Sequence, residues 1–146
     1  MLKTVIKNNL IVVVAYVSIC FIFLMLRTLM MLVGVMGASE TGIGVGIFSI
    51  ASMLSCFLVG RKFVEDTEDM LTTVLSLSPL ALVVGIILFA SAGDPQGFGG
   101  ILAIPIAPVS ETLSYFTGIN RQITYMLMSI LPSLAMWLGM LYKSKA

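Results

Sequence analysis

Four long apolar runs dominate the chain, and short polar or charged segments separate them. The runs extend over about residues 8–35, 43–60, 70–92 and 123–142. As a helix rising about 1.5 Å per residue, each run is long enough to cross the hydrocarbon core of a bilayer, which is ~30 Å thick. The pattern therefore predicts an all-α integral membrane bundle of four transmembrane helices. It leaves no room for a soluble domain, so we expect residues 1–146 to form one transmembrane domain.

A further apolar stretch, over about residues 97–116, differs from these runs because glycines and prolines interrupt it. Gly99, Gly100, Pro105 and Pro108 oppose a continuous spanning helix, while the residues between them are too apolar for a solvated loop. We therefore expect an outer re-entrant or interfacial hairpin between the third and fourth helices. Irregular backbone at membrane depth must be covered by protein or line a wet cavity, so function is also expected here.

Two prolines fall inside the third and fourth runs. Pro79 and Pro132 each remove one backbone hydrogen bond, so we expect a kink at both positions. Ser76 and Ser78 are expected to satisfy the backbone group that Pro79 frees. Thr67 is expected to be the N-cap of the third helix.

Small residues recur along the second run at steps of three and four positions, which places them on one helix face. They are Gly42, Gly46, Ser49, Ser52, Cys56 and Gly60. Such a face lets helix backbones approach closely in lipid. It predicts a helix-packing seam, either within the chain or with a second copy or partner subunit. If Gly46 lies in the seam, a bulky residue there separates the packed helices.

Lys and Arg are concentrated in both tails and in the loop at residues 61–69, which together hold six of the eight. The positive-inside rule therefore predicts cytoplasmic termini and a multi-pass protein of the cell membrane, that is, a bacterial inner membrane or a plasma membrane. The first run is longer than a signal peptide's apolar region and is expected to be retained; cleavage near Gly37–Ser39 is the alternative. The net charge of +1 gives no attraction to nucleic acid.

The inventory of reactive side chains is small. The chain has no histidine, which excludes His-based acid–base catalysis and His metal sites. The two cysteines, Cys20 and Cys56, are expected at different membrane depths as reduced thiols. We find no nucleophile–base set and no phosphate-binding loop, and therefore expect neither an enzyme nor a cofactor.

Four charged residues are candidates for pathway or partner contacts: Arg27, Glu40, Glu111 and Arg121. Arg27 is the one charge inside a predicted span, and such residues are often functional. It can instead anchor the helix by reaching the headgroups, or pair with Glu40 or Glu111. Glu111 and Arg121 belong to the outer hairpin region and are expected at the depth of Arg27.

Residues 43–146 resemble the C-terminal membrane part of type-2 ABC exporter permeases of the sodium- and drug-efflux kind. The matching pieces are GRKFVEDTED, LSLSPLALVVGIILF, IPIAPVSETLSYFTG and LPSLAMWLGMLYKSKA. Those permeases usually have six spanning helices, so the resemblance implies a half-size permease subunit that acts with a separate cytoplasmic ATPase. Other membrane subunits or a homo-oligomer, and the lipid bilayer, are the expected partners. The alternative is a non-transport accessory, immunity or regulatory protein that binds another membrane protein through the small-residue face.

Overall fold

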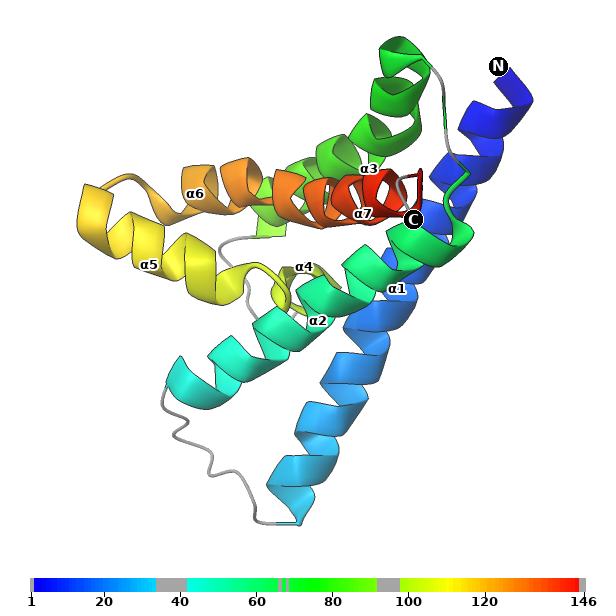
Figure 1. Ribbon diagram of the computed structural model, residues 1–146. Coiled ribbons are helices and arrows are strands. Elements are labelled where there is room, and N and C mark those ends of the chain that lie inside the picture. The colour runs from blue at the N-terminus through cyan, green and yellow to red at the C-terminus, as the bar shows by residue number, and fades with distance from the viewer. Residues whose placement is uncertain (1, 34–41, 66, 68, 92–97, 145–146) are drawn as a thin grey trace.

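The computed structural model describes residues 2–33, 42–65, 67, 69–91 and 98–144, and their regular secondary structure is entirely helical. Figure 1 shows the helices in chain order: α1 (Leu2–Leu32), α2 (Gly42–Phe63), α3 (Met70–Ser91), α4 (Phe98–Ala103), α5 (Ala107–Thr117), α6 (Arg121–Met128) and α7 (Ile130–Ser144). Four segments are long and apolar enough to span a membrane: Leu2–Leu32, Gly46–Phe63, Met70–Ser91 and Arg121–Lys143. The predicted all-α bundle with four candidate membrane spans is therefore confirmed.

Several helix ends differ from the boundaries expected from hydropathy, and capping residues mark two of the helix starts. α1 begins at Leu2 and includes the polar residues before the first apolar run. The last span begins at Arg121, where the Asn120 side chain accepts a hydrogen bond from the first helical turn at 2.8 Å. The expected N-cap of α3, Thr67, is wrong. Asp69 caps this helix instead, accepting a hydrogen bond from its first turn at 3.3 Å.

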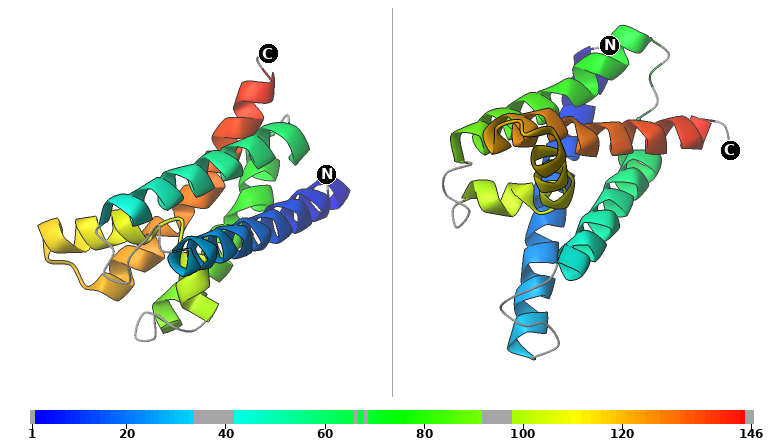
Figure 2. Two further views of the ribbon diagram at one scale, coloured as in Figure 1. Left: turned by 90° about the horizontal axis from the view of Figure 1, so that it is seen from below. Right: turned by 90° about the vertical axis from the view of Figure 1, so that its left-hand side faces the viewer.

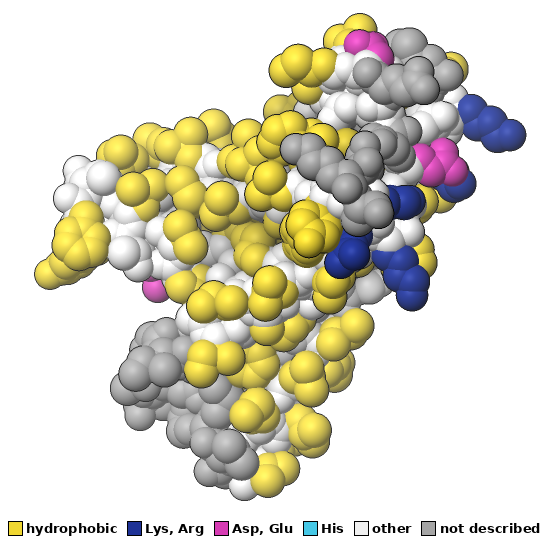
Figure 3. Space-filling view, viewed as in Figure 1, with side chains coloured by type: hydrophobic (Ala, Val, Ile, Leu, Met, Phe, Trp, Pro, Cys, Tyr) yellow, Lys and Arg dark blue, Asp and Glu magenta, His cyan; other side chains and the backbone are white. Residues whose placement is uncertain are grey.

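The basic ends of α1, α2 and α7 gather on one side of the molecule. Figures 1 and 2 place both chain ends on this side, and Figure 3 shows blue side chains clustered there. Lys7 forms an ion pair with Glu65 in the segment that follows α2. The fully buried Asn8 side chain donates to the Glu65 carbonyl and accepts from the Glu65 amide, both at 3.0 Å. These contacts join α1 to the chain between α2 and α3.

Pro79 lies inside α3, which continues without interruption on both sides of it. The missing N–H leaves the carbonyl of Leu75 without its helical donor. Asn9 of α1 supplies a replacement through its Nδ2, 3.1 Å from that oxygen. The expectation that Ser76 does so is wrong: its buried hydroxyl has no hydrogen-bond partner among the described residues. A neighbouring helix, rather than a nearby serine, satisfies the backbone.

Pro132 lies in the first turn of α7, where the helix has few backbone hydrogen bonds to lose. The break in the last span falls at Ser129, one turn earlier. The serines on either side of Pro132 join this span to α3: Ser129 donates to the carbonyl of Ala81 and Ser133 to that of Leu77, both at 3.0 Å. Pro132 cannot donate to the carbonyl of Met128, four positions earlier, and the interruption at this point divides the last span into α6 and α7.

The backbones of α2 and α7 approach each other closely at Gly60 and Gly139. A Cβ added at Gly60 would lie 2.6 Å from both the Cα and the carbonyl carbon of Met136. A Cβ added at Gly139 would lie 2.8 Å from the amide nitrogen of Arg61. Real Cβ atoms essentially never come within 3.0 Å of such atoms. These two helices can therefore cross at this distance only because both positions are glycine.

The small-residue face of α2 is only partly used in this packing. Ser49, Ser52, Cys56 and Gly60 are buried inside the molecule, as an intramolecular seam requires. Gly46 differs, because a Cβ there would meet no described heavy atom within 4 Å. The described contacts therefore do not require glycine at position 46, and the expected effect of a larger residue such as Leu stays a prediction. Gly42 begins the helix beyond this seam.

The hairpin region forms two short helices, α4 and α5, whose connection is inserted into the bundle. Leu102, Pro105 and Ile106 at this tip are almost fully buried. Tyr16, near the midpoint of α1, donates its hydroxyl hydrogen to the carbonyl of Leu102 at 2.6 Å. Ser49 of α2 donates to the carbonyl of Pro105. Two spanning helices thus supply partners for backbone carbonyls that the short helices leave unpaired.

Candidate functional site

A cavity of about 300 Å³ lies beside the α4–α5 hairpin. Every helix except α7 contributes to its wall. The lining residues are Arg27, Phe48, Leu88, Ser91, Gly99, Gly100, Ala103, Ile104, Ala107, Glu111, Arg121 and Tyr125. It is a mixed site, with three charged side chains and a tyrosine hydroxyl set in a largely apolar wall.

The turn between α5 and α6 brings the polar side chains of these two helices together. α5 ends at Gly118, whose φ of 68° is a left-handed conformation that glycine adopts without strain. Asn120 then begins α6 as its N-cap. Figures 1 and 2 show α5 and α6 lying side by side, away from the chain ends. The short reversal therefore places Glu111 of α5 opposite Arg121 of α6.

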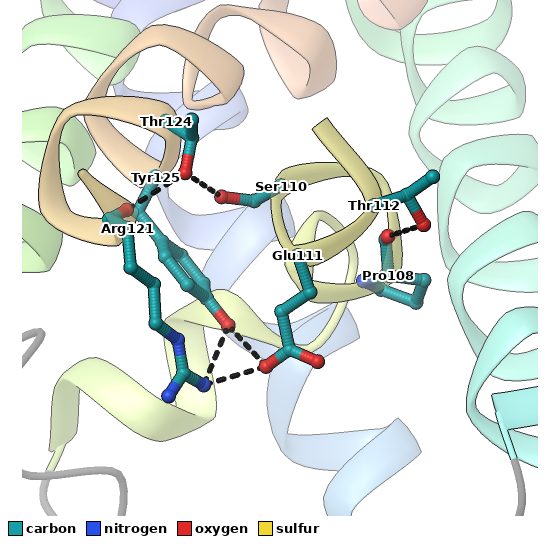
Figure 4. A network of polar contacts seen from close by, with 7 residues as sticks. All are labelled: Pro108, Ser110, Glu111, Thr112, Arg121, Thr124 and Tyr125. Atoms are coloured by element: carbon teal, nitrogen blue, oxygen red, sulfur yellow. Dashed lines mark hydrogen bonds and ion pairs between the residues drawn. The ribbon is translucent and has the colours of Figure 1, made fainter. Parts of the chain in front are cut away.

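Glu111, Arg121 and Tyr125 form a three-membered network at the cavity wall (Figure 4). The Arg121 Nη2 is 2.5 Å from Glu111 Oε1, and the Tyr125 hydroxyl donates to the same oxygen at 3.1 Å. The guanidinium carbon also lies 5.4 Å from the centre of the Tyr125 ring. Arg121 and Glu111 are each about half exposed, with side-chain exposures of 52% and 54%. Solvent therefore screens this ion pair, and its net stabilisation is small.

A second, fully buried contact holds α5 against α6. Ser110 donates its hydroxyl hydrogen to Thr124 at 3.0 Å, and Thr124 donates to the carbonyl of Arg121 at 2.8 Å (Figure 4). Neither Ser110 nor Thr124 is exposed. Within α5, Thr112 also donates to the carbonyl of Pro108 at 2.7 Å. The buried pair fixes the spacing of the helices that carry Glu111 and Arg121.

Arg27 reaches the cavity from the last two turns of α1. Its Nε is buried and has no hydrogen-bond partner among the described residues. The two ion pairs in the described part of the chain are Lys7–Glu65 and Arg121–Glu111, and neither includes Arg27. An arginine placed this way near a membrane-spanning segment is costly unless something compensates its charge.

Three of the four charged residues singled out from the sequence, Arg27, Glu111 and Arg121, line the same cavity. Glu40, the fourth, lies outside the described residues. Tyr125 was not anticipated, although its position four residues after Arg121 places the two on one helix face. Tyr16 was also missed, because nothing in its apolar surroundings indicates that its hydroxyl binds the hairpin backbone.

The other reactive side chains do not form a site. Cys20 and Cys56 are both buried free thiols. No group of three or more Cys, Asp or Glu side chains suitable for a metal ion occurs among the residues that the structure describes.

Comparison of the chain with known protein families, with curated proteins and with solved structures gave no match. The class therefore follows from the fold itself, which contains four helical segments long and apolar enough to span a membrane. The protein is a small multi-pass α-helical membrane protein.

Proposed function

We propose that this membrane protein is a half-size permease subunit, which contributes part of a solute pathway and works with a separate ATPase. The observation that carries the proposal is the α4–α5 hairpin, whose buried tip contacts the middle of α1 while its flank borders a cavity with both charged and apolar lining. Irregular backbone at membrane depth is found where protein covers it or where it lines a cavity. The covered tip and the adjoining cavity support such a depth for this segment, as in transporters whose broken helices surround a substrate site.

In the proposed orientation, the side with the basic helix ends faces the cytoplasm and the cavity opens toward the outer side. Arg61, Lys62 and Lys143 lie in the last turns of α2 and α7, and Lys3, Lys7 and Lys143 all act on the carboxylate of Glu65, so these five residues belong to the basic side. The positive-inside rule favours its retention in the cytoplasm of a cell that carries the protein in its cell membrane. The hairpin then enters from the outer side as a re-entrant segment. An ATPase would meet the basic side, next to the segment that contains Glu65.

The accessory-protein alternative is less well supported, because it relied on the small-residue face of α2 as a docking surface. Much of that face is already occupied within the chain. Gly60 is covered by α7, and Ser49 is bonded to the hairpin. A partner would have to displace these internal contacts to reach it. Association with other membrane subunits or with a second copy would have to use other apolar surfaces.

The subunit role can be tested by affinity purification from native membranes, followed by mass spectrometry. We expect an ATP-binding-cassette ATPase to copurify with the intact chain. A matched sample with Gly60→Leu, which cannot form the α2–α7 crossing, should lose this partner. Recovery of a single unrelated membrane protein, with no ATPase, would contradict the permease role.

The hairpin can be tested by single cysteines and a membrane-impermeant thiol reagent added from outside. The two native thiols are buried, so the unmodified chain serves as the control. Tyr115→Cys, at a position 84% exposed, should react fast. Ala107→Cys at the cavity should react more slowly, and Ile106→Cys at the buried tip should not react. Fast labelling of all three positions would show an ordinary exposed loop.

A further inference from the structure

The described wall of the cavity carries more positive than negative charge. Arg27 and Arg121 face one carboxylate, Glu111. Arg121 is already engaged, because it contacts both the carboxylate and the Tyr125 hydroxyl. Glu111 likewise accepts from Arg121 and Tyr125 through the same oxygen. Among the described residues that line the cavity, the charge without an ion-pair partner is therefore that of Arg27.

Arg27 reaches this cavity from α1, the helix that also contacts the hairpin through the Tyr16–Leu102 hydrogen bond. Its buried Nε lacks a described partner, so part of the guanidinium has lost water without gaining an acceptor. A planar guanidinium with free donors is well suited to bind a phosphate or carboxylate through paired hydrogen bonds. An anion in the cavity would compensate the charge and satisfy these donors.

The remaining wall is suited to a ligand that is not purely ionic. Phe48, Leu88, Ala103, Ile104 and Ala107 give the cavity an apolar surface beside Arg27. The N-terminal end of α5 reaches it through Ala107, and the N-cap residue, Ile106, makes no side-chain hydrogen bond to this helix. The positive end of the α5 dipole therefore adds to the field of Arg27. A small inorganic anion would leave most of the apolar wall without contacts.

We propose that this cavity binds a small amphipathic anion. Its phosphate or carboxylate head would contact the Arg27 guanidinium, and its apolar part would lie along the wall formed by α2, α3 and α4. The inference rests on the proposed function in one respect only, namely that this ligand is the transported solute. Binding itself requires neither an ATPase nor transport. The same head-group chemistry is offered by a soluble alkyl phosphate and by an anionic membrane lipid. The test below distinguishes these two sources.

Binding is measured on the full-length protein purified in a neutral detergent, with n-octyl phosphate as the probe and 1-octanol as its uncharged counterpart. We expect octyl phosphate to raise the thermal transition and octanol to have little effect. Arg27→Gln should weaken octyl phosphate binding by roughly ten- to a hundredfold, because it removes a charge-assisted contact. Arg27→Lys, which keeps the charge, should recover most of the affinity. Lys3→Gln, which removes an exposed charge at the other end of α1, should bind as the original protein does.

The source of the anion is identified by repeating the titration in nanodiscs. Competition by phosphatidylglycerol but not by phosphatidylcholine assigns the site to a lipid head group; unchanged octyl phosphate binding in both assigns it to a soluble anion. Equal stabilisation by octanol and octyl phosphate would overturn the proposal, as would equal affinities of Arg27→Gln and the original protein. If octyl phosphate binds as expected but no ATPase copurifies with the chain, the anion site stands and the permease role fails.

Discussion

The α2–α7 crossing offers a sharp test of the packing, because one helix contains both a glycine that the contact requires and one that it does not. Alanine at Gly60 would bring its Cβ to 2.6 Å from two backbone atoms of Met136. The carbonyl oxygen of Met136 would lie nearer still, and ordinary van der Waals contact begins at 3.4 Å, so the two helices must separate by more than about 1 Å at this point. Backbone atoms cannot move aside as a flexible side chain does. The strain therefore spreads over the whole crossing.

The expected magnitude follows from a comparison with Gly46→Ala, where the added methyl group meets no described atom within 4 Å. Both substitutions gain the same intrinsic helix preference of alanine over glycine, so this contribution cancels in the difference. What remains is the cost of overpacking, which is typically about 1–3 kcal/mol. We expect Gly60→Ala to be less stable than Gly46→Ala by this amount. Gly139→Ala should behave like Gly60→Ala, because it affects the same crossing from the other helix.

The assay is the thermal transition of each purified variant in one detergent, followed by size-exclusion chromatography of the folded fraction. For a chain of this length, we expect the transitions of Gly60→Ala and Gly139→Ala to lie on the order of 5 °C below that of Gly46→Ala. The double variant should lose less than the sum of the two single losses, since both act on one contact. Equal transitions for Gly46→Ala and Gly60→Ala would refute the close approach of α2 and α7.

Three further outcomes can be checked with the same assay. Asn8→Ala should destabilise the protein by about 2–5 kcal/mol, because it leaves both backbone groups of Glu65 unpaired. Asn9→Ala loses one exposed hydrogen bond and should cost about 1 kcal/mol or less. Equal losses of stability in the two variants would contradict the assigned contacts. The hydrogen bond and charge of Lys7 hold the pKa of Glu65 below its usual value, so the ion pair stabilises the folded protein fully at pH values above the unfolded pKa. The stability difference between the original protein and Glu65→Gln should therefore vanish as the pH falls through the lower, folded pKa. A constant difference from pH 6 to pH 3 would contradict this. Glu111→Gln should change stability by less than about 1 kcal/mol, since its ion pair is half exposed, and a larger loss would mean that the pair is shielded from solvent.

The elements of this fold could be predicted from the sequence because the signals for them are local. A run of apolar residues long enough to span a bilayer forms a helix wherever it lies in the chain, since lipid leaves the backbone no other partner. The interruption by Gly99, Gly100, Pro105 and Pro108 likewise indicates a broken segment without reference to the rest of the molecule. The concentration of Lys and Arg in three segments anticipated that both chain ends lie on one side.

The partners of individual residues depended on tertiary structure. The sequence offers two candidates, Ser76 and Ser78, for the carbonyl exposed by Pro79, but the donor is Asn9, sixty-six positions from that carbonyl. The requirement for glycine at Gly60 and not at Gly46 depends on where α7 crosses α2. A small residue shows only that a close approach is sterically allowed. The approach itself is a property of two surfaces.

For the candidate site, too, the sequence predicted some features and the tertiary structure determined others. Its charges could be named from the sequence, because a lone arginine in an apolar run and a Glu–Arg pair around a broken segment are unusual there. The sequence also predicted that Glu111 and Arg121 lie at the depth of Arg27, but not that all three line one cavity, since Arg27 comes from α1 whereas Glu111 and Arg121 come from α5 and α6. Hydropathy reports how each segment meets lipid, and it contains no information about which segments pack together. Only the packed bundle, with the hairpin tip held against Tyr16, determines that these three side chains share one cavity.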